Sequence, residues 1–127
     1  MSMKTYVAAC TALIACFAAG HAAAVYGPTS KGRISVTQVM AMLDNAAKQP
    51  AAQQVLSAYL TGLGETAGIL IDNASGASCQ ERMTLDPGLV RRALIKAVPD
   101  RTNWQETAAT ALIIKDMMDR AACKTGR

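Results

Sequence analysis

The sequence has few of the side chains that catalyse reactions or bind metals. It contains one histidine, His21, and one phenylalanine, and aromatic residues make up only 4% of it. His21 lies in a segment that we expect to be removed, and its loss excludes Ser-His and Cys-His catalysis as well as histidine metal sites. The two cysteines outside that segment do not supply the four ligands of a zinc site. We therefore predict no catalytic residue, no metal and no cofactor, and we do not expect an enzyme.

The N-terminal segment has the pattern of a secretory signal peptide. Lys4 precedes an almost unbroken apolar stretch from Tyr6 to Gly20, and Ala22-Ala23-Ala24 follows it. A positive charge, an apolar core and a cleavage site of small-x-small residues are the three parts of such a signal, so we expect residues 1–24 to be removed by cleavage. The apolar stretch is shorter than the roughly 20 residues that a membrane span needs. The protein is then expected in the periplasm.

A second interpretation of the same segment stays open. Residues 13–16, Leu-Ile-Ala-Cys, fit a lipobox, in which Cys16 would be lipidated and would become the first residue of an anchored protein. Apolar residues continue after Cys16, however, whereas a lipid anchor is usually followed by a polar tether. Cleavage after Ala24 is therefore favoured, and a lipoprotein at Cys16 is the alternative.

The rest of the chain is large enough for one small domain of about 100 residues. The sequence carries 13 Lys and Arg against 9 Asp and Glu, and the cations are scattered, so nucleic acid is not an expected partner. Tyr26, Tyr59 and Trp104 are the only aromatic residues after the leader. The core must then consist of Leu, Ile, Val, Met and Ala, which is typical of a helical bundle.

Cys79 and Cys123 are the cysteines that remain after the leader. An even pair in an oxidising compartment is expected to form a disulfide. The bond would close a loop of about 45 residues, for which the chain-entropy estimate is about 4 kcal/mol. We interpret the pair as a structural cross-link.

Helical periodicity predicts the first half of the domain. Residues 25–34 contain two glycines and a proline and no period, and we expect a flexible arm. Ser35 with Gln38 forms a capping box for a helix over 36–47. Pro50 suits the first position of a second helix, which we expect to run to about residue 73. That helix contains Gly62, Gly64 and Gly68, each of which costs about 1 kcal/mol against alanine, so we expect a neighbouring helix to approach closely there.

Two further helices are expected in the second half. Asp86 and Pro87 mark the start of the third, which ends before Pro99. The fourth is expected to be capped by Thr102 with Gln105 or by Asn103 with Glu106, and to end at Cys123. Its apolar face should comprise Ala108, Ala111, Leu112, Lys115, Met118 and Ala122, widened by Ile114 and Met117. The prediction is an all-α fold, a small bundle of about four helices over residues 35–127, stapled by one disulfide.

Carboxylates are the remaining acid–base groups to consider. Glu65 and Asp72 lie seven residues apart on the second predicted helix and would share one face. A carboxylate pair can hydrolyse glycosides. No aromatic platform or cleft signal accompanies this pair, so we interpret it as a solvated stripe.

The order of several residues resembles one known pattern. A Tyr-x-x-Gly element, Tyr59 to Gly62, is followed by Cys79, and then by Leu85, Leu89-Val90, Pro99, Ala108-Ala109, Leu112-Ile113 and Ala121-Ala122-Cys123. This order resembles the Rap/Tai-type immunity proteins of bacterial type VI secretion, which are similar in outline to the periplasmic acid chaperone HdeA. The resemblance extends over residues 36–124 and implies a periplasmic protein that binds and blocks a peptidoglycan amidase delivered by neighbouring cells.

The chain departs from that pattern at two places. Many relatives carry a further cysteine just before the Tyr-x-x-Gly element, where this chain has Leu56-Ser57-Ala58, so one disulfide would be absent. Relatives also tend to have Phe-Pro before the last cysteine, where this chain has Ala121-Ala122.

We expect a protein partner, a cell-wall hydrolase toxin, to be contacted by two loops, 73–82 and 99–104. Arg and Trp are common interface anchors, and short side chains can enter a cleft. The candidate contact residues are Ser75, Gly76, Ser78, Arg101, Asn103 and Trp104. Packing at the start of the fourth helix is the alternative role for Trp104, and plain solvent exposure is the alternative for Arg101 and Ser78. A homodimer is left open, and an HdeA-like chaperone or general envelope binding protein is the alternative function.

Overall fold

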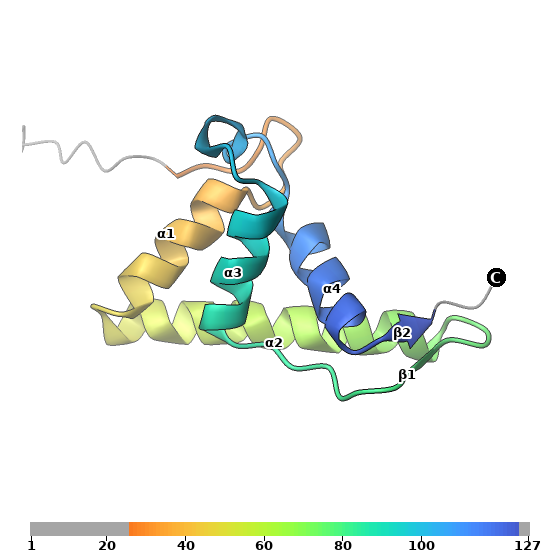
Figure 1. The fold of residues 1–127 in the computed structure, drawn as a ribbon. Coiled ribbons are helices and arrows are strands. Elements are labelled where there is room, and N and C mark those ends of the chain that lie inside the picture. Colours follow the sequence, from red (N-terminus) through yellow and green to blue (C-terminus); the bar gives the residue numbers. More distant parts are fainter. Residues whose placement is uncertain (1–25, 125–127) are drawn as a thin grey trace, which may run out of the picture.

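The structure is a computed structural model that describes residues 26–124. Within this range α2 forms the base of the molecule, and the other three α-helices lie on one side of it (Figure 1). The helices are α1 (Val36–Ala46), α2 (Pro50–Asp72), α3 (Pro87–Ala97) and α4 (Ala109–Arg120). The predicted all-α bundle of about four helices is confirmed. The predicted leader, residues 1–24, and the lipobox alternative at Cys16 lie outside the described residues.

Three shorter elements connect or follow these helices. A one-turn 3₁₀ helix, η1 (Arg101–Asn103), precedes α4. Two short strands, β1 (Ser78–Cys79) and β2 (Cys123–Lys124), pair antiparallel, with Cys79 opposite Cys123. No strand was expected from the sequence, because two residues are too few to show an alternating pattern.

The predicted starts of α1 and α3 are confirmed. The Ser35 hydroxyl accepts a hydrogen bond from the Gln38 N–H at 3.1 Å, and the Asp86 carboxylate accepts one from the Leu89 N–H at 2.9 Å. Each bond pairs one of the N–H groups that a helix leaves without an internal partner. Pro50 begins α2 as predicted, at a position where its missing N–H costs nothing.

The core is built from aliphatic side chains and methionine, as the scarcity of aromatic residues predicts. Its fully buried centre joins α1, α3 and α4 through Val36, Val39, Val90, Leu94 and Ile113. Leu56 and Leu63 add the inner face of α2. Tyr59 and Trp104 pack only at the edge of this cluster. A core of this kind has no single dominant residue, so its stability is spread over many methylene contacts.

The segment before α1 is a docked part of the domain, so the prediction of a flexible arm is wrong for residues 27–34. The Gln105 side-chain amide donates to the Gly27 carbonyl at 3.0 Å, and the Glu106 carboxylate accepts hydrogen bonds from both the N–H and the hydroxyl of Ser30. Thr29 is buried. Gly32 lies in a turn closed by its N–H and the Thr29 carbonyl. The hydrogen bonds that join the segment to Gln105 and Glu106 span more than 70 residues, and local sequence cannot indicate them.

The predicted start of α4 is wrong. Asp100, not Thr102 or Asn103, acts as a cap: its carboxylate accepts from the Thr102 N–H at 2.9 Å and begins η1. Gln105 and Glu106 bind the segment before α1 instead of a helix N-terminus. The α-helix begins only at Ala109, with no side-chain cap.

The end of α4 also differs from the prediction. The helix ends at Arg120, because Ala122 takes a left-handed conformation with φ of 48° and turns the chain into β2. Proline, whose ring fixes φ near −65°, cannot adopt this conformation. At Ala122, where the sequence differs from the Rap/Tai-type proteins that it resembles, the backbone thus has a conformation that a Phe-Pro sequence could not form.

The glycines of α2 do not mark a close helix contact. A Cβ atom added at Gly62, Gly64 or Gly68 would meet no atom within 4 Å outside the helix's own neighbouring backbone. The expectation that a neighbouring helix approaches there is wrong. Because nothing fills this space, the glycines reduce the intrinsic stability of a 23-residue helix without a packing gain.

Ser35 has the buried hydroxyl on which the docking of the N-terminal segment depends, and the variant Ser35→Ala tests this role. We expect it to lower the free energy of unfolding by about 2 kcal/mol, because the Gln38 N–H loses its partner and the Gly27 carbonyl loses one of its two donors, keeping only Gln105. Urea denaturation measures the loss. Ser57→Ala, at an exposed position of α2, is the control and should change stability by less than about 0.5 kcal/mol. An equally small effect of Ser35→Ala would contradict this role.

The disulfide between Cys79 and Cys123 has an S–S distance of 2.01 Å. The double variant Cys79→Ala/Cys123→Ala should lose about 3 to 4 kcal/mol of stability, because the unfolded chain is no longer closed into a loop. Urea denaturation with and without a reducing agent gives the value, and reduction should leave the double variant unchanged. Detection of two free thiols in the native protein, by alkylation and intact mass, would refute the bond.

Ala122 is in a conformation that favours glycine, which has no Cβ to clash with the preceding backbone. We expect Ala122→Gly to raise the free energy of unfolding by about 1 kcal/mol. Ala47→Gly is the matched control, since Ala47 also follows a helix and is exposed but has φ of −68°. The control should lose stability. A loss of stability in both variants would show that Ala122 is not strained.

Candidate functional site

The first predicted contact loop contains a tight turn between α2 and β1. The Ala77 N–H donates to the Ala74 carbonyl at 3.0 Å, and Gly76, the third residue of the turn, has φ of 75°. A positive φ at this position is the geometry of a type II turn, which glycine adopts without strain. The side chains of Ser75 and Ser78 are exposed, as is Gly76.

This loop extends beyond the end of α4, at the side of the molecule where β1 and β2 pair (Figure 1). Three kinds of contact hold its ends. Asn73 donates from its side chain to the Ile69 carbonyl at 2.8 Å, the disulfide fixes Cys79, and the N–H groups of Gln80 and Glu81 both donate to the Ala121 carbonyl. A protruding loop with fixed ends loses little conformational entropy when it binds.

The second predicted set lies at η1, and its members differ in role. Trp104 is half-buried against the core, and its indole N–H donates to the Val98 carbonyl at 2.8 Å. Its packing role, the alternative considered above, is therefore what the structure shows. The backbone of Asn103 is held within its turn, since its carbonyl accepts a hydrogen bond from the Thr107 hydroxyl at 2.7 Å. Arg101 is exposed and lies over the Trp104 ring, with its guanidinium carbon 5.2 Å from the ring centroid.

The two predicted sets are not brought together. The turn that contains η1 lies at the opposite end of the molecule from the loop before β1 (Figure 1). The residues between them belong to α4, whose first turn follows η1 and whose last turn leads to Cys123. A partner that contacted both sets would have to extend along α4.

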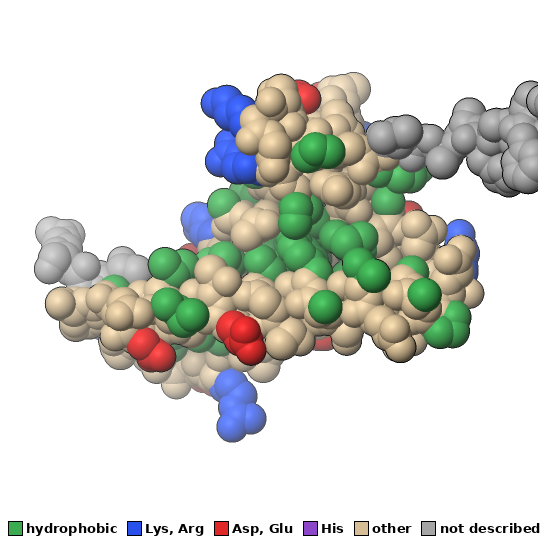
Figure 2. All heavy atoms as spheres, turned by 180° about the vertical axis from the view of Figure 1, so that it is seen from behind, with side chains coloured by type: hydrophobic (Ala, Val, Ile, Leu, Met, Phe, Trp, Pro, Cys, Tyr) green, Lys and Arg blue, Asp and Glu red, His purple; other side chains and the backbone are tan. Residues whose placement is uncertain are grey.

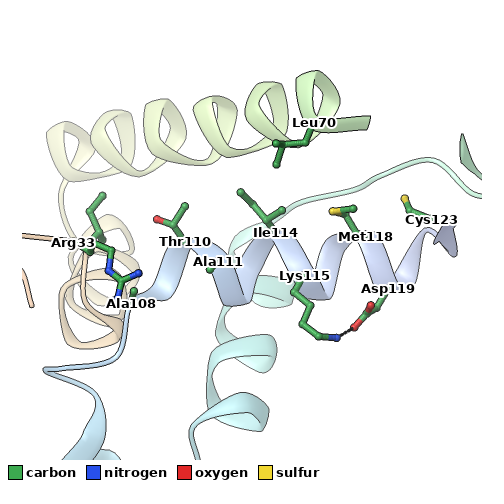
Figure 3. A pocket seen from close by; sticks show the side chains of 11 residues that line it. Arg33, Leu70, Ala108, Thr110, Ala111, Ile114, Lys115, Met118, Asp119 and Cys123 are labelled. Carbon is green, nitrogen blue, oxygen red and sulfur yellow. Dashed lines mark hydrogen bonds and ion pairs between the residues drawn. The ribbon is translucent and has the colours of Figure 1, made fainter. Parts of the chain in front are cut away.

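A groove along α4 is the largest concave site among the described residues that we find, and the sequence did not indicate it. Its volume is about 750 Å³. Figure 3 shows Thr110, Ile114 and Met118 on the side of α4 that faces Leu70 of α2. Arg33 and Ala108 lie at one end of the groove and Cys123 at the other. Hydrophobic side chains also gather in a band above α2 on the face opposite to that of Figure 1 (Figure 2).

The predicted apolar face of α4 is only partly correct, since Met117 is buried and Leu112 and Ile114 pack against the core, but other members line the groove. The buried residues of this helix are Ala109, Ile113 and Met117. Most of the predicted face lines the groove instead, namely Ala108, Ala111, Lys115 and Met118. Apolar residues occur on both sides of α4, so periodicity alone could not distinguish the side in the core from the side that remains open.

Three described side chains have displaced pKa values, and each has a structural cause. Burial raises the pKa of Tyr59, against the opposing effect of its hydrogen bond with Thr110 at 3.1 Å. Hydrogen bonds from Thr102 lower the pKa of Asp100, and those from Ser30 lower the pKa of Glu106. The Glu106 contact with Ser30 is thus fully formed at neutral pH and is lost as the pH falls through the lowered pKa of this carboxyl group.

Glu65 and Asp72 are both exposed, in agreement with their interpretation as a solvated stripe. Residues 26–124 contain no group of three or more His, Cys, Asp or Glu side chains that could hold a metal ion. In the same range, no helix combines the length and apolar character needed to cross a membrane.

Three features therefore lie along α4: an exposed loop with fixed ends beyond its C-terminal end, the exposed Arg101 before its N-terminal end, and an open, mostly apolar groove between them. Comparison of the chain with protein-family models, curated proteins and solved structures found no match.

Proposed function

We propose that this protein is a periplasmic immunity protein, which binds and inhibits a peptidoglycan amidase delivered by type VI secretion. The proposal draws on the residue pattern around Tyr59, Gly62, Cys79 and Cys123, which resembles the Rap/Tai-type proteins. In the structure these residues lie on α2 and at the two strands that the disulfide joins. A small cross-linked domain with an exposed loop fits an inhibitor of a cell-wall enzyme.

The observation that carries the proposal is the loop that ends at Cys79. An inhibitor must occupy a catalytic cleft, and this loop protrudes, carries short side chains and is held at both ends. Ser75 and Ser78 offer hydroxyl groups as donors or acceptors, and Gly76 lets the backbone approach closely. Arg101 at the far end of α4 is available as a second contact, whereas Trp104 acts as its support.

Co-expression with any peptidoglycan amidase that is encoded next to the gene of this protein tests the proposal. The amidase in the periplasm should lyse the cells, and the exported domain should rescue them. The double variant Ser75→Arg/Ser78→Arg should abolish rescue and weaken binding at least about 30-fold, because bulky charged groups replace the tip that enters the cleft. Arg101→Glu should weaken binding by a smaller factor. The contact residues at η1 and those in the loop before β1 lie far apart, so their contributions to binding should be independent.

Matched controls separate loss of binding from loss of folding. Ser57→Arg and Lys48→Glu introduce the same kinds of change at exposed positions in and before α2, away from both loops. These controls should rescue fully, and all variants should show the unfolding midpoint of the unchanged protein. If the purified domain binds no cell-wall hydrolase encoded nearby, the immunity function is wrong.

One observation favours the alternative, an HdeA-like chaperone or general envelope binding protein. Three large apolar side chains of α2 are more than half exposed, namely Val55 at 58%, Ile69 at 60% and Leu70 at 51%. Met117 of α4 lies in the core and adds nothing to such a surface, whereas Met118 lines the groove. Protection of an unfolded client protein at low pH, with no hydrolase bound, would establish the alternative. Light scattering on the same sample would report a homodimer.

A further inference from the structure

We propose that the groove along α4 binds an anionic amphiphile, a molecule with one acyl chain and a carboxylate or phosphate head. The groove's volume of about 750 Å³ is in the range of small-molecule sites, which are typically lined by apolar side chains with a few polar groups. Here the apolar lining is contributed by Ile34, Leu70, Ala111, Ile114 and Met118.

The length of the groove suits one acyl chain. It follows α4 from Ala108 to Cys123, and the 12 residues of that helix span about 18 Å. A single acyl chain extends over about 15 Å, half of the hydrocarbon thickness of a bilayer. Met118 lies in the half of the groove near Cys123, where its flexible thioether can adapt to the chain (Figure 3).

The charges of the groove select the sign of the head group. Lys115 is paired with Asp119 at 2.5 Å, so these two lining residues neutralise each other. Arg33 is the other charged lining residue, and among residues 26–124 its side chain takes part in no ion pair or hydrogen bond. Figure 3 places Arg33 at the start of α4, beside Ala108. One end of an apolar groove therefore carries an uncompensated positive charge, which favours an anion there.

The position of Arg33 also fixes the orientation of the ligand. The head group would lie near Arg33 and the N-terminal end of α4, and the chain would extend past Ile114 and Met118 toward Cys123. An α-helix of a partner protein is about 10–12 Å across, so it could only lie on the groove with one of its faces. Binding of an amphiphile does not depend on whether the loops contact a hydrolase.

The disulfide-bonded protein, titrated with four probes that share a twelve-carbon chain, tests the proposal. The probes are laurate, dodecyl phosphate, dodecanol and dodecyltrimethylammonium, each below its micellar concentration, and calorimetry measures the affinity. We expect a single site. It should bind both anions about fivefold more tightly than dodecanol, a modest ratio because an exposed ion pair contributes little free energy, and it should bind the cation most weakly of the four probes. The affinity for laurate should exceed the affinity for decanoate by up to about fourfold for each of the two extra methylenes. The two anions distinguish a carboxylate from a phosphate ligand.

Two variants with matched controls locate the site. Arg33→Glu should reverse the head-group preference, while Lys31→Glu, an exposed cation of the same segment outside the groove, should not. Ala111→Trp should fill the groove and reduce laurate affinity at least tenfold, while Ala58→Trp, at an exposed position of α2 outside the groove, should not. Unfolding midpoints verify that each variant folds.

Three outcomes would overturn the proposal. The first is that none of the probes binds, and the second is that binding is equal for anionic and cationic heads or is unaffected by Arg33→Glu. The third is a protein that is dimeric in light scattering and becomes monomeric with Ala111→Trp, since the groove would then be covered by a second copy. Anion-selective binding that Ala111→Trp abolishes and Ala58→Trp leaves intact would support it.

Discussion

The fold depends on one junction, where the chain before α1 meets the chain before α4. Ser35 is fully buried there, and its hydroxyl donates to the Gly27 carbonyl while it accepts from the Gln38 N–H. The Val36 N–H donates to the Thr107 carbonyl and the Ala109 N–H to the Ile34 carbonyl. These bonds pair the free backbone groups at the starts of two helices at once, groups that would be costly to bury without partners. The angle between α1 and α4 is therefore set by hydrogen bonds as well as by packing.

The junction and the disulfide lie at opposite ends of α4, and together they determine what this helix can present. Its first turn is held against residues 34–36, and the residues after its last turn are held by β1 and by Cys79. One face, with Ile113 and Met117, is fixed in the core. The adjacent face, with Ile114 and Met118, therefore cannot turn further inward. The groove is thus a result of how α4 is held, and it does not require a ligand to remain open.

Local signals in the sequence predicted those parts of the fold that local interactions determine. Ser35 and Asp86 cap the helices that follow them, because a cap and its N–H partner are only three residues apart. The start of α4 could not be predicted in this way, since Gln105 and Glu106 have partners more than 70 residues distant. The candidate site also has a part that local sequence determines and a part that it does not. Exposure of Ser75 and Ser78 follows from the composition of their loop, whereas the groove requires Arg33 and Leu70, which only the tertiary structure places beside α4.

The junction also has a consequence for the order in which the chain can fold. A chain that emerges N-terminus first presents Ser30 and Ser35 long before Glu106 and Thr107, and Cys79 long before Cys123. α1 and α2 can pair early, but the N–H groups of Val36 and Thr37 stay solvated until Trp104 and Thr107, in the last quarter of the chain, arrive. Closing such distant contacts carries a loop-entropy cost that local contacts avoid. The disulfide and the pairing of β1 with β2 can form only after the chain is complete through Cys123 and Lys124, so a truncation within α4 would remove both.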